Sequence, residues 1–276
     1  MTVQSRQRKR GKKMTRLCPL FSGSSGNSYY IGTSENGVLI DVGRSARQIE
    51  TALKENDLDI HNVKAIFITH EHSDHIQGLR VLASRHHIRV FSSVGTIEAL
   101  TEKDLINDKV DIDVIDSVGV EVCGMKITPF PISHDCREGF GYVAESSDGR
   151  RTGFATDTGY ISKEMKTALH GCDTVVLESN HDIGMLQCGL YPYILKRRIL
   201  SDIGHLSNET AAEYAAELVR NGTTRIVLAH ISRENNIPEL ALQTSLCTLE
   251  QNGMKQNIDF ILSAAPVANT SGSMIY

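Results

Sequence analysis

The chain has 276 residues, of which 40% are hydrophobic, so it is long enough to bury the core of one large domain. Its six cysteines are scattered without a C-x-x-C pair, which excludes the disulfide framework of a small secreted protein and favours reduced thiols. The net charge is −4, yet residues 1–13 carry six basic residues and no acidic one, so the remainder is acidic and general binding of nucleic acid through a basic surface is excluded.

Short β-branched segments alternate with amphipathic segments from residue 15 onward. Strands are predicted at 28–32, 38–41, 65–69, 89–92, 120–123, 125–129, 139–145, 152–155, 174–178, 225–229 and 258–262. Helices are predicted at 45–56, 75–86, 95–105, 162–170, 191–203, 208–221 and 238–252. Strand pairs near the start and βα units in each half predict an α/β fold in which two facing sheets are covered by helices on both outer faces.

Both ends of the chain are expected to lie outside one domain at 14–265. The charge of residues 1–13 favours a disordered basic tail over an arm that binds nucleic acid, and residues 266–276 lack apolar periodicity and are expected to form a loose tail. No apolar stretch approaches the roughly 20 residues of a membrane span, and no signal region follows the charged N-terminus. We therefore expect a cytoplasmic protein without a membrane partner.

The densest group of reactive side chains is the segment THEHSDH, residues 69–75, which follows the apolar run 65–68. The run predicts a buried strand, so the segment lies on the loop at the carboxyl end of the strand and on the first turn of a helix. His70 and His72 project to one side of an extended chain, while Asp74 and His75 face a neighbouring position, so the spacing can serve two metals. A set of metal ligands that includes a carboxylate and no cysteine is typical of a catalytic metal site rather than a structural one. The alternative is a helix-capping loop.

Three further strand ends carry suitable ligands: His134, Asp157 and His230. Each alone is more typical of a turn or a cap, but together with the first cluster they predict a dinuclear centre. One metal is assigned His70, His72 and His134, the other is assigned Asp74, His75 and His230, and Asp157 bridges the two. Imidazole and carboxylate ligands without thiolate suit two divalent ions, Zn²⁺ or Mn²⁺.

These segments resemble a known family. In order, "LIDVG", "THEHSDH", "ISHD", "ATDTG" and "LAHIS" are similar to the five motifs of the metallo-β-lactamase fold, over about residues 15–263. The resemblance implies an αββα sandwich of two mixed sheets with the site at one edge. More narrowly, "FSGSSGNSYYIG", "ESNHD" and "GHLSN" resemble the WalJ/YycJ group of bacterial exonuclease-like hydrolases. Lactamases and glyoxalase II share only the general ligand pattern, and flavodiiron oxidases place Glu where this chain has His72.

Several residues are predicted to support the ligands or the substrate. Asp41, at a strand end beside the ligand loop, is expected to accept the second N–H of a metal-bound imidazole, with a plain turn as the alternative. Ser25 and Asn27 lie in a loop of small residues that can face an anion or simply form a hairpin turn. Lys196 and Arg197, in a basic run of a predicted helix, either grip a phosphate or form a solvated face.

Glu178 ends a predicted strand, and His205 precedes the predicted helix 208–221. By their chemistry they can act as an orienting carboxylate and a general acid. The arrangement is similar to that of tRNase Z and related phosphodiesterases, in which the Glu orients the His and the His contacts the scissile phosphate or protonates the leaving oxygen. We place Asp74 with this pair among the catalytic residues. The alternative for His205 is a neighbour of a helix cap.

The favoured interpretation is a metal-dependent hydrolase of phosphodiesters in nucleic acid, an exonuclease-like enzyme with DNA favoured over RNA and with a metal-bridging hydroxide as nucleophile. One alternative is a hydrolase of a small ester, thioester or lactam, which needs the same metals without Glu178 and His205. Another is a regulatory protein with a vestigial site, against which the complete ligand set argues.

Overall fold

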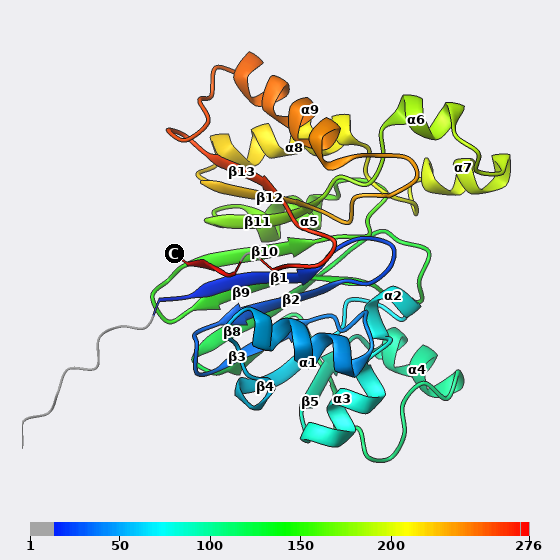
Figure 1. The fold of residues 1–276 in the computed structure, drawn as a ribbon, viewed down its shortest axis with the longest axis vertical. Helices are drawn as coiled ribbons and strands as arrows, with labels where there is room; N and C mark the ends of the chain where they lie inside the picture. The colour runs from blue at the N-terminus through cyan, green and yellow to red at the C-terminus, as the bar shows by residue number, and fades with distance from the viewer. Residues whose placement is uncertain (1–13, 271, 276) are drawn as a thin grey trace, which may run out of the picture.

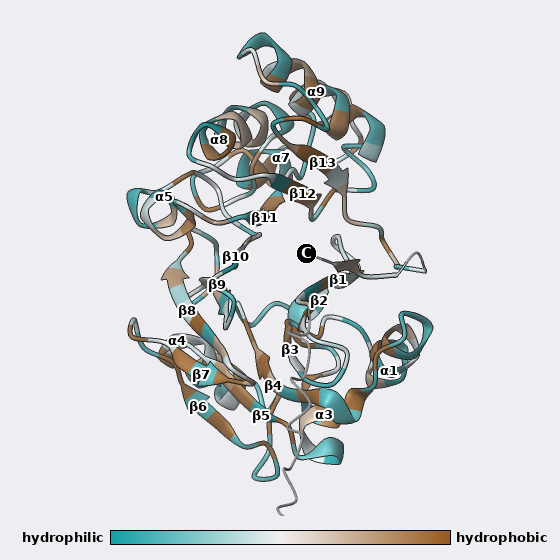
Figure 2. Ribbon diagram, turned by 90° about the vertical axis from the view of Figure 1, so that its left-hand side faces the viewer, coloured by the Kyte–Doolittle hydropathy of each residue, from teal (hydrophilic) through white to brown (hydrophobic). Residues whose placement is uncertain are grey.

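The computed structural model describes residues 14–270 and 272–275, so the expected basic tail at 1–13 lies outside the described residues. Two sheets pack face to face with helices on both outer sides (Figures 1 and 2), which confirms the predicted α/β sandwich. The first sheet has the order β14 (Met274–Ile275), β1 (Arg16–Phe21), β2 (Ser28–Gly32), β3 (Gly37–Ile40), β4 (Val63–Phe67), β5 (Arg89–Ser92), β6 (Ile112–Val114). The second has the order β13 (Ile261–Ala264), β12 (Arg225–Ala229), β11 (Thr174–Glu178), β10 (Arg151–Ala155), β9 (Phe140–Ser146), β8 (Met125–Pro131), β7 (Val120–Val122).

The helices divide between the two sheets. Four lie on the side of the first sheet: α1 (Ala46–Glu55), α2 (Ser73–Ile76), α3 (Leu79–His86) and α4 (Val94–Glu102). Three cover the second sheet: α5 (Lys163–Leu169), α8 (Asn208–Arg220) and α9 (Pro238–Gln251). Two short ones, α6 (Ile183–Cys188) and α7 (Tyr193–Ile199), project at the edge where α2 also lies (Figure 1). Among the described residues no helix combines the length and the apolar character that a membrane crossing requires.

Side chains alternate between two buried layers, because each sheet has a helical layer on one face and the other sheet on its opposite face. On β4, Phe67 points between the sheets, while Ile66 packs toward the helices of its own side. The ring of Phe67 stacks on Phe91 with centroids 5.1 Å apart and meets Tyr142 of the second sheet edge-on at 5.6 Å. Burial on both faces explains why these strands are continuous apolar runs in the sequence.

The strand directions bring the predicted ligands to one edge. Strands β3, β4 and β5 are parallel to one another, and so are β10, β11 and β12. The carboxyl ends of parallel strands lie at the same edge of a sheet, so the segments that follow β4, β10 and β12 converge there. The backbone is strained at this edge: Asp41, Asp157 and His230, one or two residues after their strands, have φ of 60°, 59° and 53°.

The structure differs from the prediction in several segments, and β6 and α6 were not predicted at all. The helix predicted at 75–86 is interrupted at Gly78, because the N–H of this residue donates to the carbonyl of Val42 and not to the preceding helical turn. The helix predicted at 191–203 is shorter, since the chain turns after α7 and the N–H of His205 donates to the carbonyl of Ile199. Strand β1 was missed; it contains Pro19, which disfavours a strand.

The expected loose tail at 266–276 is wrong for part of its length. Residues Met274–Ile275 form β14, which pairs antiparallel with β1. Before the strand, Asn269 is buried, and its carbonyl accepts a hydrogen bond from Nδ2 of Asn56. The N–H of Gly272 donates to Oδ1 of the same asparagine. These long-range contacts, rather than local periodicity, order the segment.

Candidate metal centre and active site

Three imidazoles from both sheets converge on one point. Nδ1 of His72 lies 3.1 Å from Nε2 of His70 and 3.2 Å from Nε2 of His134. Nδ1–H of His134 donates to the carbonyl of Gly204 at 3.2 Å, which leaves its Nε2 for the shared point. These three residues form one of the groups whose ligand atoms lie within 4.8 Å of one another. The sequence assigned the same three to one metal.

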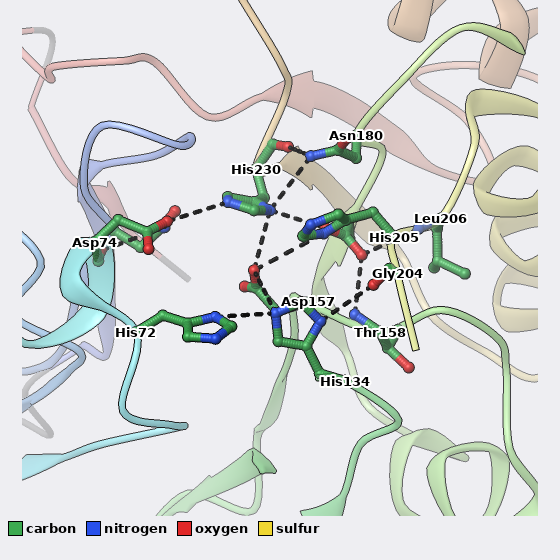
Figure 3. A network of polar contacts seen from close by, with 12 residues as sticks. His72, Asp74, His134, Asp157, Thr158, Asn180, Gly204, His205, Leu206 and His230 are labelled. Atoms are coloured by element: carbon green, nitrogen blue, oxygen red, sulfur yellow. Dashed lines mark hydrogen bonds and ion pairs between the residues drawn. The ribbon is translucent and has the colours of Figure 1, made fainter. Parts of the chain in front are cut away.

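A second group lies beside the first (Figure 3). Oδ2 of Asp74 is 3.6 Å from Nε2 of His75 and also 3.6 Å from Nε2 of His230. Asp157 lies between the two groups: its Oδ2 is 3.3 Å from Nε2 of His75, and its Oδ1 is 4.0 Å from Nε2 of His134. Asp157 is therefore placed where one carboxylate reaches both positions.

The donor set fits divalent metal ions. Among the described residues, Oδ2 of Asp157 and Nε2 of His230 are buried without a hydrogen-bond partner, as expected of atoms that await a cation. Burial lowers the pKa of His70 and of His134, which keeps these imidazoles neutral as ligands must be. Burial alone would lower the pKa of His230 as well, but carboxylates led by Asp157 outweigh it and raise that pKa to about 10. The site thus has a surplus of negative charge that cations would compensate.

Asp41 supports the second group of candidate ligands through hydrogen bonds to His75 and Thr69. Its Oδ2 accepts a hydrogen bond from Nδ1 of His75 at 2.8 Å and another from the hydroxyl of Thr69 at 2.9 Å. Its Oδ1 accepts from the N–H of Thr69 at 2.8 Å. Nε2 of His75, the ring nitrogen opposite, faces Asp74 and Asp157. A carboxylate in this position fixes the tautomer and the orientation of the imidazole.

Glu178 and His205 lie next to the same groups. Oε1 of Glu178 accepts from Nδ1 of His205 at 2.8 Å and from Nδ1 of His230 at 2.8 Å, and Oε2 accepts from the N–H groups of Thr158 and Leu206. Burial would raise the pKa of Glu178, but His205 and then His230 outweigh it and lower that pKa to about 2. The carboxylate is therefore ionised and fixed by four hydrogen bonds, and the ring of His205 lines the pocket of about 220 Å³ at the metal positions.

The four residues predicted to contact substrate have different surroundings. Ser25 lines a large groove beside the metal centre, where its hydroxyl accepts from the guanidinium of Arg44. Asn27 is fully buried, and its Nδ2 lies 3.1 Å from Nε2 of His75, so it braces the ligands and does not face the substrate side, contrary to the prediction. Lys196 was also predicted wrongly: Nζ donates to the carbonyls of Gln187 and Gly189, which end α6. Arg197 is exposed on the outer face of α7.

Sequence reasoning did not single out several residues of the pocket, among them Arg198 and Asn180. Arg198 lines it and forms an ion pair with Asp135. Leu195, three residues earlier on α7, shares the same lining, but no local pattern in the sequence separates Arg198 from its two basic neighbours. Asn180 donates from Nδ2 to the carbonyl of His230 at 2.9 Å, and the only indication of it in the sequence was its position two residues after a buried strand.

Comparison with known proteins gives the family. A model described as beta-lactamase superfamily domain matches residues 36–231. The chain belongs to the beta-lactamase superfamily. It is 43% identical to the exodeoxyribonuclease YycJ of Bacillus anthracis over 236 residues, which cover 85% of this chain and 89% of that protein. It is 38% identical to the exodeoxyribonuclease WalJ of Streptococcus pneumoniae over 245 residues, which cover 87% and 90%.

A solved structure shares the architecture. Human tRNase Z, short form, aligns with a TM-score of 0.60 at 18% identity, covering 79% of this chain and 93% of that one. At this identity the likeness shows the fold alone. The resemblance to the metallo-β-lactamase fold and to the WalJ/YycJ group is confirmed.

Proposed function

We propose that this chain is a metal-dependent phosphodiester hydrolase acting on nucleic acid, and specifically an exodeoxyribonuclease-type enzyme with two divalent ions, Zn²⁺ or Mn²⁺. The observation that carries the proposal is the Glu178–His205 pair, joined at 2.8 Å and lying beside the seven candidate metal ligands. A hydrolase of small esters or lactams needs the ligands but has no requirement for this pair. Relatives named exodeoxyribonucleases, at 43% and 38% identity, favour DNA as the polymer.

The seven ligand residues would hold the ions as the sequence assigned them. His70, His72 and His134 would hold one, and Asp74, His75 and His230 the other, with Asp157 common to both. Two ions at such a site supply a nucleophilic hydroxide at neutral pH and neutralise charge on the phosphate. Asp41 and Glu178 would keep His75 and His230 in the tautomer that directs Nε2 to the ion.

His205 would perform the proton transfer. With Nδ1–H donated to Glu178, Nε2 is the nitrogen left for the pocket that the ring lines. A protonated Nε2 can give its proton to the departing sugar oxygen, while the ionised carboxylate stabilises the imidazolium before the transfer. Because water is the nucleophile, the scheme requires no serine or cysteine at the site.

The test is an assay of metal-defined protein on four polymers and one control substrate. Single-stranded, duplex and nicked DNA and an RNA of equal length would be compared with a chromogenic lactam. We expect nucleotides to be released from a DNA end, with RNA a poorer substrate, and activity to be lost after chelation. Hydrolysis of the lactam without any cleavage of a phosphodiester would overturn the proposal.

A further inference from the structure

Two hollows adjoin the pocket at the proposed metal positions and share lining residues with it. A groove of about 860 Å³ shares Ser24, His72 and Asp74 with the pocket and extends over α2 and α3. A smaller hollow of about 290 Å³ lies on α7 and shares Arg198 with the pocket. A linear polymer that is cut at the metal centre extends in both directions from the scissile bond. The larger groove has room for a longer stretch of the polymer than the smaller hollow has.

The smaller hollow has unusual surface chemistry. Tyr193 is 74% exposed and Ile194 is 83% exposed, although both are large apolar side chains. The guanidinium of Arg197 lies 6.0 Å from the centre of the Tyr193 ring. Exposed aromatic rings with arginine beside them are the surfaces on which unpaired bases stack, because every base offers a π face and every nucleotide a negative charge.

Arg198 connects this hollow to the metal positions. It lines both cavities, and its Nε is paired with Asp135, whose Oδ1 lies 3.4 Å from Nε2 of His134. The ion pair with Asp135 orients the guanidinium, whose remaining N–H groups suit a phosphate. Charge also favours a polyanion here over a second copy of the chain: α7 contributes Arg197 and Arg198, whereas the chain as a whole has a net charge of −4.

We propose that the outer face of α7 is a subsite for the terminal nucleotide of the strand. The base stacks on Tyr193 beside Arg197, Arg198 holds the phosphate that leads to the metal centre, and the larger groove takes the rest of the strand. The hollow has about the smallest volume of a ligand pocket, roughly 300 Å³, which matches one nucleotide rather than several. This inference rests on the proposed function and adds to it the position at which the strand end is recognised.

The experiment compares two single-stranded oligodeoxynucleotides that differ only at the end under attack, where one carries a base and the other an abasic sugar. The wild-type protein should prefer the base-bearing end by about 5- to 150-fold in kcat/KM, the range that corresponds to one base–aromatic stack. In Tyr193→Ala the preference should fall to about one. Tyr193→Phe keeps the ring and should keep the preference, as should the control Ile258→Ala, an exposed apolar residue in the loop before β13.

The possible results distinguish a failure of the proposed subsite from a failure of the proposed function. A Tyr193→Ala enzyme that retains the wild-type preference overturns the subsite and leaves the hydrolase intact. A wild-type protein that cleaves duplex or nicked DNA but neither oligonucleotide also overturns the subsite alone, and one that cleaves no DNA overturns both. If light scattering shows that Tyr193→Ala changes the molar mass of the protein while the preference stays, this face is a contact between two copies and the subsite is wrong.

Discussion

Oε1 of Glu178 lies 2.8 Å from Nδ1 of His230, at the same distance as from Nδ1 of His205. The sequence paired Glu178 with His205 alone, as the orienter of a general acid. In the structure one oxygen serves both a proposed metal ligand and the proposed acid, so substitutions at the two positions should have different consequences for the metals.

His205→Ala should leave metal content unchanged and reduce turnover on DNA by about 10²- to 10⁴-fold, the usual loss when a positioned general acid is removed. The loss should be smaller on a nitrophenyl phosphodiester, because nitrophenolate departs without a proton. Steady-state kinetics with elemental analysis checks this, with the exposed His170→Ala as control. Loss of metal in His205→Ala would make this residue a ligand instead.

Glu178→Gln should reduce both turnover and the affinity for metal. The substitution removes the charge shared by His205 and His230, and supporting partners of metal-bound imidazoles typically contribute about 10- to 100-fold in affinity. Competition with a chelating dye measures the affinity. An affinity equal to that of the wild type would show that the contact with His230 has no role in metal binding.

Asp157→Asn should lower metal content more than any other single ligand substitution, because one carboxylate lies against both groups. Metal-replenished wild-type protein should approach two equivalents per chain by elemental analysis. Saturation of the wild type at one equivalent would exclude the dinuclear mechanism. Asparagine is the suitable replacement, since it tolerates the φ of 59° at this position.

Asp41→Asn should weaken metal binding by about 10- to 100-fold through loss of the charge that holds His75. Asp57→Asn is a matched control, because Asp57 also has a positive φ, 56°, but is exposed. Equal metal affinity in both variants would contradict the supporting role of Asp41.

Deletion of residues 1–13 should leave the hydrolysis of a small phosphodiester unchanged, because the ligands and Glu178 lie in the rest of the chain. On polynucleotides the deletion should cause at most a loss that shrinks with added salt, as expected when basic groups contact phosphates. Kinetics at two salt concentrations provides the measurement. An equal loss on both substrates would place the segment in the catalytic fold.

The convergence of the candidate ligands could be predicted from sequence because each follows a buried apolar strand, and strands that run in the same direction bring their carboxyl ends together. The role of Arg198 could not, because the choice among three consecutive basic residues depends on how α7 is rotated against the pocket. The interruption at Gly78 depends on the carbonyl of Val42, which accepts from the N–H of Gly78. Strand β14 depends on pairing with β1, at the other end of the chain. Contacts between segments that are distant in the chain produce no periodic pattern in the local sequence.

Each proposed metal position draws ligands from both sheets: His70, His72, Asp74 and His75 follow β4, whereas His134 and His230 follow β8 and β12. An ion bound there would be a cross-link between segments far apart in the chain. Closing such a loop restricts the unfolded ensemble as a disulfide does, in a protein whose six cysteines are free. Loss of metal would thus remove a cross-link between the two halves of the sandwich at the edge where we propose that substrate binds, and would leave the apolar layer between the sheets to hold them together.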